Sequence, residues 1–182
     1  MNDALTSLNG THELVWSLLE AGPKSKAATA NLVVLATSSI ENGPSARIVV
    51  LRHVDRVSGI LRVFTHAASQ KVADLNEDER AEIMIWDPVE QLQIRLTVNI
   101  EVSHVDSETW SRLGPGTRLN YAVDPTPGTP IEAPENARQA TPEASQMLCL
   151  NARVLSIETL HITSDGLSRA VFQDGTSQWI AP

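Results

Sequence analysis

The sequence predicts a mainly β protein, an antiparallel barrel that is closed or nearly closed, with a few short helices around it. Runs of strand length are separated by turn signals along most of the 182 residues. The chain also lacks the regular alternation of strands and helices that a doubly wound sheet requires. Its hydrophobic fraction of 42% and its length fit one globular domain, residues 1–182.

The first predicted elements are a helix and a strand. The helix covers about residues 11–22, with Thr11 as a candidate N-cap and apolar residues at helical spacing behind it. A Gly-Pro pair ends this helix. The apolar run 32–36 predicts a strand, and the Asn-Gly pair at 42–43 is the hairpin signal that follows it.

Two more strands and the start of a helix make up residues 45–71. Strands at 46–54 and 60–64 are separated by a turn cluster at 55–59. Ser69 then lies where the N-cap of the next helix is expected. The chain is organised around this stretch, because a strand, a turn, a second strand and a helix start lie close together in it.

Cationic and hydroxyl side chains gather in the same stretch. Arg47 and Arg52 lie in its first strand. Thr65 follows its second strand, and Lys71 lies in the first turn of the helix. A lone arginine on a strand usually faces solvent, but together with exposed backbone N–H groups these side chains predict a phosphate site. Arg47 and Arg52 point to opposite faces of an unbroken strand, so both reach one ligand only if the strand bulges or the ligand lies over its end.

The rest of the chain is predicted to add strands, two short helices and one long loop. These elements are a short helix after Ser69, strands at 81–86 and 92–102, a short helix capped by Asp106 or Ser107, a Pro-rich loop at about 114–145 with a helical turn near 119–122, strands at 147–157 and 167–173, a turn at 164–166, and a tail anchored by Trp179. The strand at 92–102 alternates between apolar and polar residues, which predicts one buried side and one polar or ligand-facing side.

Composition and charge disfavour several classes of partner. The chain carries 14 Lys and Arg against 22 Asp and Glu, a net charge of -8, which disfavours nucleic acid and anionic membranes. The N-terminus lacks a signal-peptide pattern, and no apolar stretch approaches the ~20 residues that span a bilayer, so a soluble cytoplasmic protein is expected. The single cysteine, Cys149, and the scattered histidines predict no disulfide within the chain and no metal site.

The predicted phosphate-binding stretch carries a family motif. The motif reads Gly43-Pro44-Ser45-x-Arg47-x-Val49-x-Leu51-Arg52, then Phe64-Thr65, then Ser69-Gln70-Lys71. In this pattern the chain resembles the flavin-binding core of the pyridoxamine 5′-phosphate oxidase-like proteins, over about residues 14–105 and again near the C-terminus. Those proteins are split β-barrels of Greek-key type that bind FMN at a dimer interface. The resemblance therefore implies FMN as the cofactor and a homodimer with FMN at the subunit interface.

The resemblance also implies a role for each matched residue. Arg47 and Arg52 match positions that contact the flavin phosphate and ring, and Lys71 matches a position that holds the phosphate from the helix start. Gln93 matches a glutamine that reaches the flavin from the partner subunit. The implied cofactor-binding set is Arg47, Ile48, Val49, Val50, Leu51, Arg52, Phe64, Thr65, Ser69, Gln70, Lys71, Gln93 and Arg169.

Departures from the family pattern concern mainly the substrate side. The family has a Trp in the strand that here covers 157–160, and an Arg-x-His pair where this chain has residues 165–168. Gln70 and Thr97 also replace a common Arg and Gly. We therefore expect a retained cofactor site and a changed substrate, so that the protein is a flavin-dependent oxidoreductase acting on an unidentified small molecule, with no acid or base assigned. The alternatives are a non-catalytic flavin or ligand carrier on the same fold, and a ligand-free β-barrel interaction module.

Overall fold

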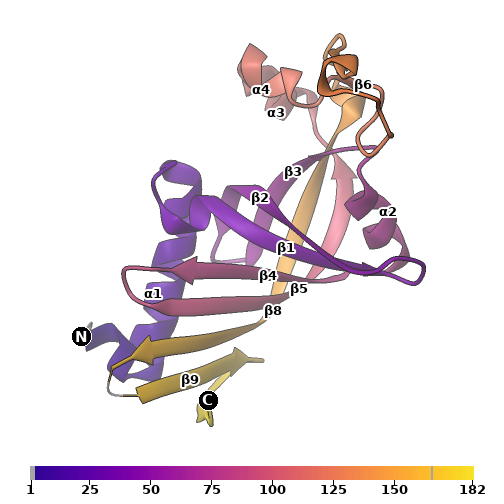
Figure 1. The fold of residues 1–182 in the computed structure, drawn as a ribbon. Coiled ribbons are helices and arrows are strands. Elements are labelled where there is room, and N and C mark those ends of the chain that lie inside the picture. The colour runs from indigo at the N-terminus through magenta and orange to yellow at the C-terminus, as the bar shows by residue number, and fades with distance from the viewer. Residues whose placement is uncertain (1–2, 165) are drawn as a thin grey trace.

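The computed structural model describes residues 3–164 and 166–182 and consists mainly of one large antiparallel sheet (Figure 1). Its helices are α1 (Leu8–Ala21), α2 (Gln70–Glu77), α3 (Ser107–Arg112) and α4 (Pro115–Leu119). Its strands are β1 (Leu32–Ser39), β2 (Gly43–Asp55), β3 (Ile60–His66), β4 (Arg80–Asp87), β5 (Leu92–His104), β6 (Val123–Asp124), β7 (Arg138–Gln139), β8 (Met147–Thr163), β9 (Gly166–Gln173) and β10 (Thr176–Ile180). The turn predicted at 164–166 includes Asp165, which lies outside the described residues.

The sheet closes into a split barrel. Its strand order is β10-β9-β8-β3-β2-β1-β4-β5, and β5 also pairs with β8, which closes six of the strands on themselves. Because β4 returns beside β1 after the β1-β2-β3 meander, the order is that of a Greek key. The long strand β8 makes this closure possible, since its first half pairs with β3 and its second half with β9, while β5 runs along both halves. The predicted fold class is confirmed.

The barrel core follows the alternation seen in the sequence. Leu92, Ile94, Leu96 and Val98 of β5 are all fully buried, while the residues between them lie at least partly in solvent. Full burial of each such side chain contributes about 1.5–3 kcal/mol. The prediction of a two-sided strand at this position is therefore confirmed.

Helix α1 begins earlier than the sequence pattern indicated. Ser7, not Thr11, is its N-cap, and the Ser7 hydroxyl accepts a hydrogen bond from the Gly10 N–H at 3.1 Å. Thr11 lies one turn inside the helix, where its hydroxyl donates to the Ser7 carbonyl at 2.9 Å. Both residues are ordinary N-caps, and the one that precedes the first helical turn has the extended backbone that a cap requires. The correction adds one turn to the helix.

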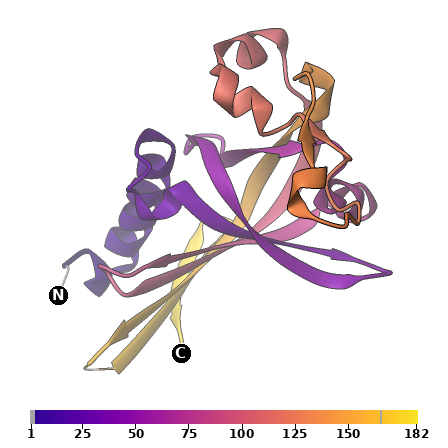
Figure 2. The same ribbon diagram turned by 45° about the horizontal axis from the view of Figure 1, so that its top comes forward.

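The two ends of the molecule carry different structures. Residues 107–145 stand beyond one end of the barrel, whereas the β9-β10 extension lies beyond the other (Figures 1 and 2). The predicted Pro-rich loop contains α4 and the β6-β7 pair, and its helical turn lies at 115–119 rather than 119–122. The tail, for which no strand was predicted, forms β10 against β9. None of the helices among the described residues is both long and apolar enough to span a membrane.

Candidate functional site

A cavity of about 290 Å³ lies where β2, the end of β3 and the first turn of α2 meet the segment 107–145. It contains most of the residues predicted to bind the cofactor. The lining residues are Arg47, Ile48, Val49, Val50, Arg52, Phe64, Thr65, His66, Lys71, Asn120 and Tyr121. Three separate parts of the chain therefore build one pocket, and the β2-β3 hairpin that the sequence singled out forms most of its wall.

A β-bulge lets both arginines of β2 reach this pocket. The pairing with β3 shifts between Leu51, which lies opposite Val63, and His53, which lies opposite Arg62. Arg52 is the extra residue, and a bulge of this kind re-aims the side chain that it carries. This is one of the two geometries that the five-residue spacing of Arg47 and Arg52 required. Leu51 is fully buried in the core, so only its backbone is available to a ligand.

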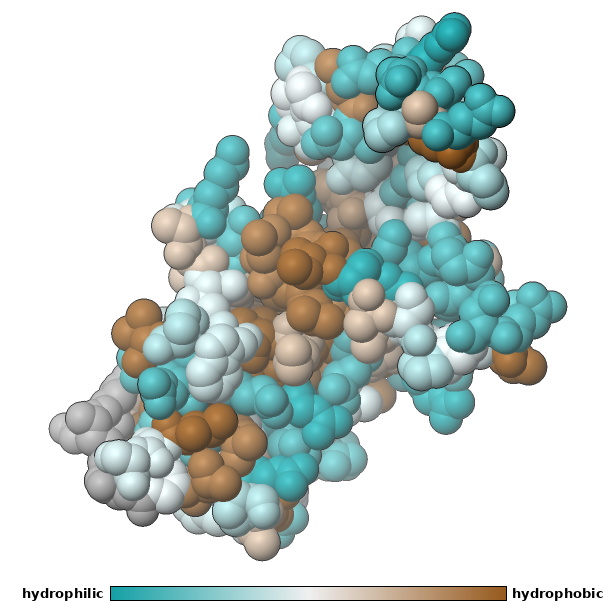
Figure 3. Space-filling model, in the orientation of Figure 1, coloured by the Kyte–Doolittle hydropathy of each residue, from teal (hydrophilic) through white to brown (hydrophobic). Residues whose placement is uncertain are grey.

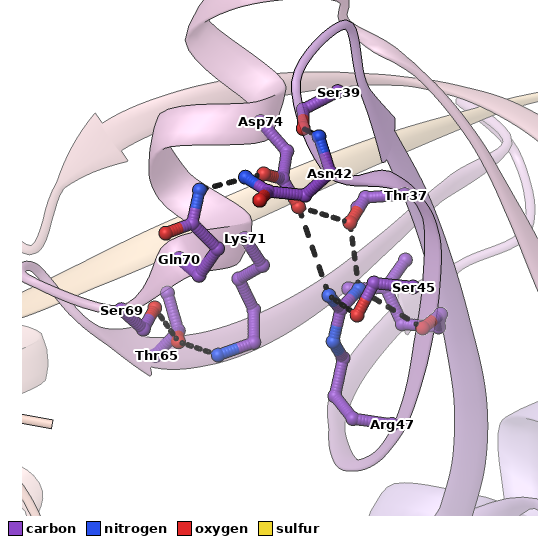
Figure 4. Close-up of polar contacts among 11 residues, drawn as sticks. Thr37, Ser39, Asn42, Ser45, Arg47, Thr65, Ser69, Gln70, Lys71 and Asp74 are labelled. Carbon is purple, nitrogen blue, oxygen red and sulfur yellow. Dashed lines mark hydrogen bonds and ion pairs between the residues drawn. The ribbon is translucent and has the colours of Figure 1, made fainter. Parts of the chain in front are cut away.

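Arg47 is held in place by oxygens of β1 and β2. Its guanidinium donates to the Thr37 hydroxyl at 2.8 Å, to the Leu35 carbonyl at 3.2 Å and to the Ser45 hydroxyl at 3.0 Å. It also lies 3.7 Å from the carboxylate of Asp74 (Figure 4). Burial lowers the pKa of Arg47, and Asp74 opposes that effect. The guanidinium is thus fixed before any ligand arrives.

Asp74 is the buried counter-ion of this region. Its side chain is 2% exposed, and its carboxylate accepts hydrogen bonds from the Thr37 hydroxyl at 2.7 Å and from the Gln70 amide at 3.1 Å. Gln70 therefore binds Asp74 and does not line the pocket. Together with Ser69 it borders a separate cavity of about 370 Å³ against Pro127 and its neighbours. Two of the predicted cofactor residues thus lie beside the pocket rather than in its wall.

Lys71 supplies a second cation next to Arg47. Its ammonium donates to the Thr65 hydroxyl at 3.1 Å, and that hydroxyl lies 3.1 Å from the hydroxyl of Ser69 (Figure 4). The pKa of Lys71 is lowered, first by burial and then by the charge of Arg47, while Asp74 opposes the shift. We call Arg47, Arg52, Lys71 and Asp74 the pocket cluster. It holds three cations and one carboxylate, and Arg47 lies closest to that carboxylate, so an anion would relieve the excess positive charge.

His66 is a pocket residue that the sequence did not single out for binding. Its Nδ1 accepts a hydrogen bond from the Ala68 N–H at 3.0 Å. Burial and the charge of Lys71 lower the pKa of His66, so the ring is neutral and its proton lies on Nε2. Nε2 is buried and has no hydrogen-bond partner among the described residues. Buried donors are nearly always paired, so an unpaired one is unusual among the residues that line this pocket.

Asn120 and Tyr121 come from the segment 107–145 and form the remaining wall. Tyr121 is 8% exposed. Burial raises the pKa of its phenol, and the nearby Arg52 opposes this effect. Neither residue could be placed from sequence, because their position depends on how α4 and the following turn fold back over the end of the barrel.

Gln93 and Arg169 lie together but outside the pocket. Both are opposite Leu160, one on β5 and the other on β9, on the outward-facing side of the sheet. The Arg169 guanidinium donates to Glu158 at 2.8 Å. The structure therefore places these two predicted residues in one row of the sheet, on either side of Leu160, and apart from the pocket of their own chain.

The residues of the pocket fit a cofactor that carries a phosphate and a polar ring, as FMN does. Arg47, Lys71 and the Thr65 hydroxyl suit a phosphate dianion. The unpaired Nε2–H of His66 and the guanidinium of Arg52 are donors for ring oxygens or nitrogens. A somewhat larger cavity of about 340 Å³ lies between α1 and the β8-β10 strands, but the described residues that line it include no Lys or Arg. That cavity offers no comparable phosphate site.

The fold is a split β-barrel with a cation-rich pocket where β2, β3 and α2 meet. The family model for pyridoxamine 5′-phosphate oxidase matches residues 24–148, so the chain belongs to that family. A pyridoxine-5′-phosphate oxidase of Dictyostelium discoideum is 33% identical over 103 residues, which are 56% of this chain and 43% of that protein. A pyridoxine/pyridoxamine 5′-phosphate oxidase 2 of Arabidopsis thaliana is 30% identical over 144 residues, 71% of this chain and 72% of that protein.

Two solved structures share the fold over nearly the whole chain. One is a pyridoxamine 5′-phosphate oxidase-related, FMN binding protein from Nostoc punctiforme, with a TM-score of 0.76, 22% identity and coverage of 97% of this chain and 100% of that one. The other is PhzG from Burkholderia lata in complex with tetrahydrophenazine-1-carboxylic acid, with a TM-score of 0.73, 17% identity and coverage of 94% and 92%. At these identities the similarity shows the fold. By contrast, the match to the Dictyostelium discoideum enzyme spans less than half of that enzyme.

Proposed function

We propose that the protein binds FMN in the pocket described above and uses it to oxidise or reduce a small molecule. The observation that carries this proposal is the excess of cations in the pocket cluster beside the unpaired His66 donor. A dianionic phosphate next to Arg47 and Lys71 would replace repulsion between two cations with charge-assisted hydrogen bonds. Membership of the family and the FMN-binding neighbour from Nostoc punctiforme support the choice of FMN among phosphate-bearing ligands.

We further propose a homodimer with FMN at the subunit interface. The pocket volume of about 290 Å³ lies at the lower end of the ~300–1000 Å³ that ligand sites occupy, as expected for half of a site. The barrel surface beside it is apolar: Leu32 is 54% and Ile48 67% exposed. Figure 3 shows apolar side chains gathered over β1 and β2 on this face. A second copy of the chain is the proposed cover.

The cross-strand register supports an isologous contact through this face. Ile48 lies opposite Val34, Val34 opposite Met84, and Met84 opposite Arg95, so that one outward-facing row runs across β2, β1, β4 and β5. Gln93 lies one outward position further along β5. In a twofold dimer each copy presents the same patch to the other. Gln93 and Arg169 of one subunit would then complete the pocket of its partner, which accounts for their distance from their own pocket.

In this proposal some side chains bind the cofactor and others shape the pocket. Bound FMN supplies the hydride chemistry itself. Arg47 and Lys71 hold the phosphate, while Arg52 and the Nε2–H of His66 donate to the ring edge and favour negative charge there. Tyr121 shields one wall from water. No side chain in the pocket is assigned as an acid or base.

The test is a titration of the purified protein with FMN, followed by flavin fluorescence and by the visible spectrum after desalting. We expect retained flavin absorption, and an affinity loss of ~100-fold or more in the double variant Arg47→Ala/Lys71→Ala, which removes two charge-assisted contacts. The control Arg80→Ala/Arg112→Ala removes the same charge from exposed local pairs. A loss within about threefold in the double variant would place the phosphate elsewhere. A colourless protein that retains no FMN would favour the interaction module.

A flavin or ligand carrier is the second candidate function. The changed residues at 157–160 and 166–168 favour it, since the family's substrate groups are absent from those positions. Adding NADPH to the loaded protein and then a candidate acceptor separates the two. Reduction followed by reoxidation that depends on the acceptor supports the enzyme, and a flavin that is not turned over supports the carrier.

A further inference from the structure

Four charged side chains on the outward face form a network that does not touch the pocket of their own chain. They are Glu82 of β4, Arg95 of β5, Glu158 of β8 and Arg169 of β9, which we call the outer-face network. Arg95 binds Glu82 through two parallel hydrogen bonds of 2.9 and 2.7 Å. It also donates to Glu158 at 3.1 Å, and Arg169 donates to the same Glu158 oxygen at 2.8 Å. One carboxylate oxygen therefore joins two arginines from different strands.

The network is electrically balanced and ordered. Its two arginines face two glutamates, so it has no need of an external anion, in contrast to the pocket cluster. Glu158 is the least exposed member, with a side chain 22% exposed. The carboxylates of Glu82 and Glu158 raise the pKa of Arg95 well above its usual range. Surface ion pairs contribute little to the free energy of folding. The main consequence of this network is therefore that it fixes the direction of its long side chains.

Arg169 is the member whose direction bears on the proposed site. It lies opposite Leu160, which also lies opposite Gln93, so Arg169 and Gln93 share one row on the outward face. An arginine on a surface strand samples many rotamers, and a bound carboxylate selects among them. A guanidinium has five N–H donors, so the bond to Glu158 leaves Arg169 able to donate to a ligand as well.

We propose that Glu158 is a positioning residue that holds Arg169 toward the FMN pocket of the partner subunit. This inference rests on the proposed FMN-binding homodimer. Glu158 does not itself touch the cofactor; it acts through Arg169, to which it is joined by a hydrogen bond of 2.8 Å. The alternative is that the network only ties β4, β5, β8 and β9 together.

A matched pair of variants separates the two roles. Glu158→Gln and Glu82→Gln each remove one negative charge and weaken one contact of Arg95, but only Glu158 contacts Arg169. For Glu158→Gln we expect FMN affinity to fall by about tenfold and the visible circular dichroism of bound FMN to change, because the ring contact is displaced. For Glu82→Gln we expect affinity within about twofold of the parent protein. Equal effects of the two variants would show that the network only stabilises the sheet and would overturn the proposal.

A mixed dimer tests whether Arg169 acts on the partner subunit. Glu158→Gln chains are co-expressed with Arg47→Ala/Lys71→Ala chains, and the mixed species is isolated with two affinity tags. In this dimer one of the two sites is intact: its pocket comes from the Glu158→Gln chain, and its Arg169 comes from the other chain, where Glu158 still holds it. We expect one FMN per dimer with the affinity of the parent protein. Only weak binding would show that Arg169 does not act in trans. A parent protein that binds no FMN would instead refute the proposed function, and this inference with it.

Discussion

The pocket cluster and the outer-face network are built from the same kinds of side chain, and they differ in balance. The pocket cluster holds three cations, Arg47, Arg52 and Lys71, and the single carboxylate of Asp74. In the outer-face network each arginine has a glutamate, and every member lies partly in solvent. A surplus of cations in a pocket is relieved when an anion binds, whereas a balanced set of charges needs no ligand. Charge balance, more than the presence of arginines, therefore distinguishes the proposed binding site.

The largest effect is expected when the carboxylate of the pocket cluster is compared with a carboxylate of the outer-face network. Asp74→Ala removes the buried acceptor of Thr37 and Gln70 and the counter-ion of Arg47. We expect the free energy of unfolding, measured with urea, to fall by about 2–4 kcal/mol, because buried polar partners are left unpaired. Glu82→Ala in the outer-face network should cost less than ~1 kcal/mol, because water can replace its bonds. Equal losses would remove the distinction between the two clusters.

The next test concerns the pH dependence of FMN binding. Burial and Arg47 lower the pKa of Lys71, so its charge is lost below the ordinary lysine value of about 10.4. FMN affinity should fall by about tenfold as pH rises through that pKa, since only the ammonium binds the phosphate strongly. In the same window the FMN-free protein should gain stability with pH, because its unfolded state binds more protons.

Lys71→Arg provides the matched control, because arginine stays charged over the whole range. Its affinity curve should be flat where that of the parent protein declines. A decline of the same size in Lys71→Arg would assign the pH effect to another group and weaken the assignment of Lys71 to the phosphate.

A smaller effect is expected from the unpaired donor. His66→Phe removes the Nε2–H that has no partner among the described residues. One lost hydrogen bond corresponds to about 1 kcal/mol, so FMN affinity should fall about fivefold in a fluorescence titration. Stability without FMN should fall by at most about 1 kcal/mol, because the variant also removes Nδ1, which accepts the exposed hydrogen bond from the Ala68 N–H. Unchanged affinity would mean that the flavin does not reach this wall of the pocket.

The smallest effect is expected at an exposed balanced pair. Arg112 and Glu108 form an ion pair one helical turn apart in α3, and both side chains are more than 70% exposed. Arg112→Ala should leave the urea midpoint unchanged within error and FMN affinity unaffected. A measurable loss of either would show that exposed pairs in the segment 107–145 support the pocket.

The sequence allowed the hairpin β2-β3 and the start of α2 to be predicted because their signals are local. Turn residues, β-branched runs and the cap position at Ser69 lie within one stretch of chain, and the spacing of two arginines left a bulge in β2 as one of two possibilities. The alternation of buried and solvent-facing residues along β5 was likewise predicted from a local pattern. Positions that depend on neighbouring residues alone could thus be predicted from the sequence.

The rest of the site depends on contacts between distant segments. Asn120 and Tyr121 enter the pocket because residues 107–145 fold over the barrel end, and nothing near them in sequence indicates that contact. The tautomer of His66 follows from a bond to Ala68 and from the neighbouring Lys71. Strand β10 was missed because a short polar tail becomes a strand only when β9 offers its edge. The start of α1 was misplaced because two cap residues compete within one turn.

The long strand β8 has a consequence for when the cofactor can be bound during synthesis. Residues up to 104 supply β1 to β5 and α2, yet β3 and β5 each have a partner on one side only until β8 arrives, when Met147 pairs with His66 and Leu148 with His104. Pairings between such distant residues form late and slowly. When the nascent chain has emerged from the ribosome only up to residue 138, most of the pocket residues therefore lie on an open sheet. We expect stable flavin loading to await the emergence of β8, the last strand needed to close the barrel.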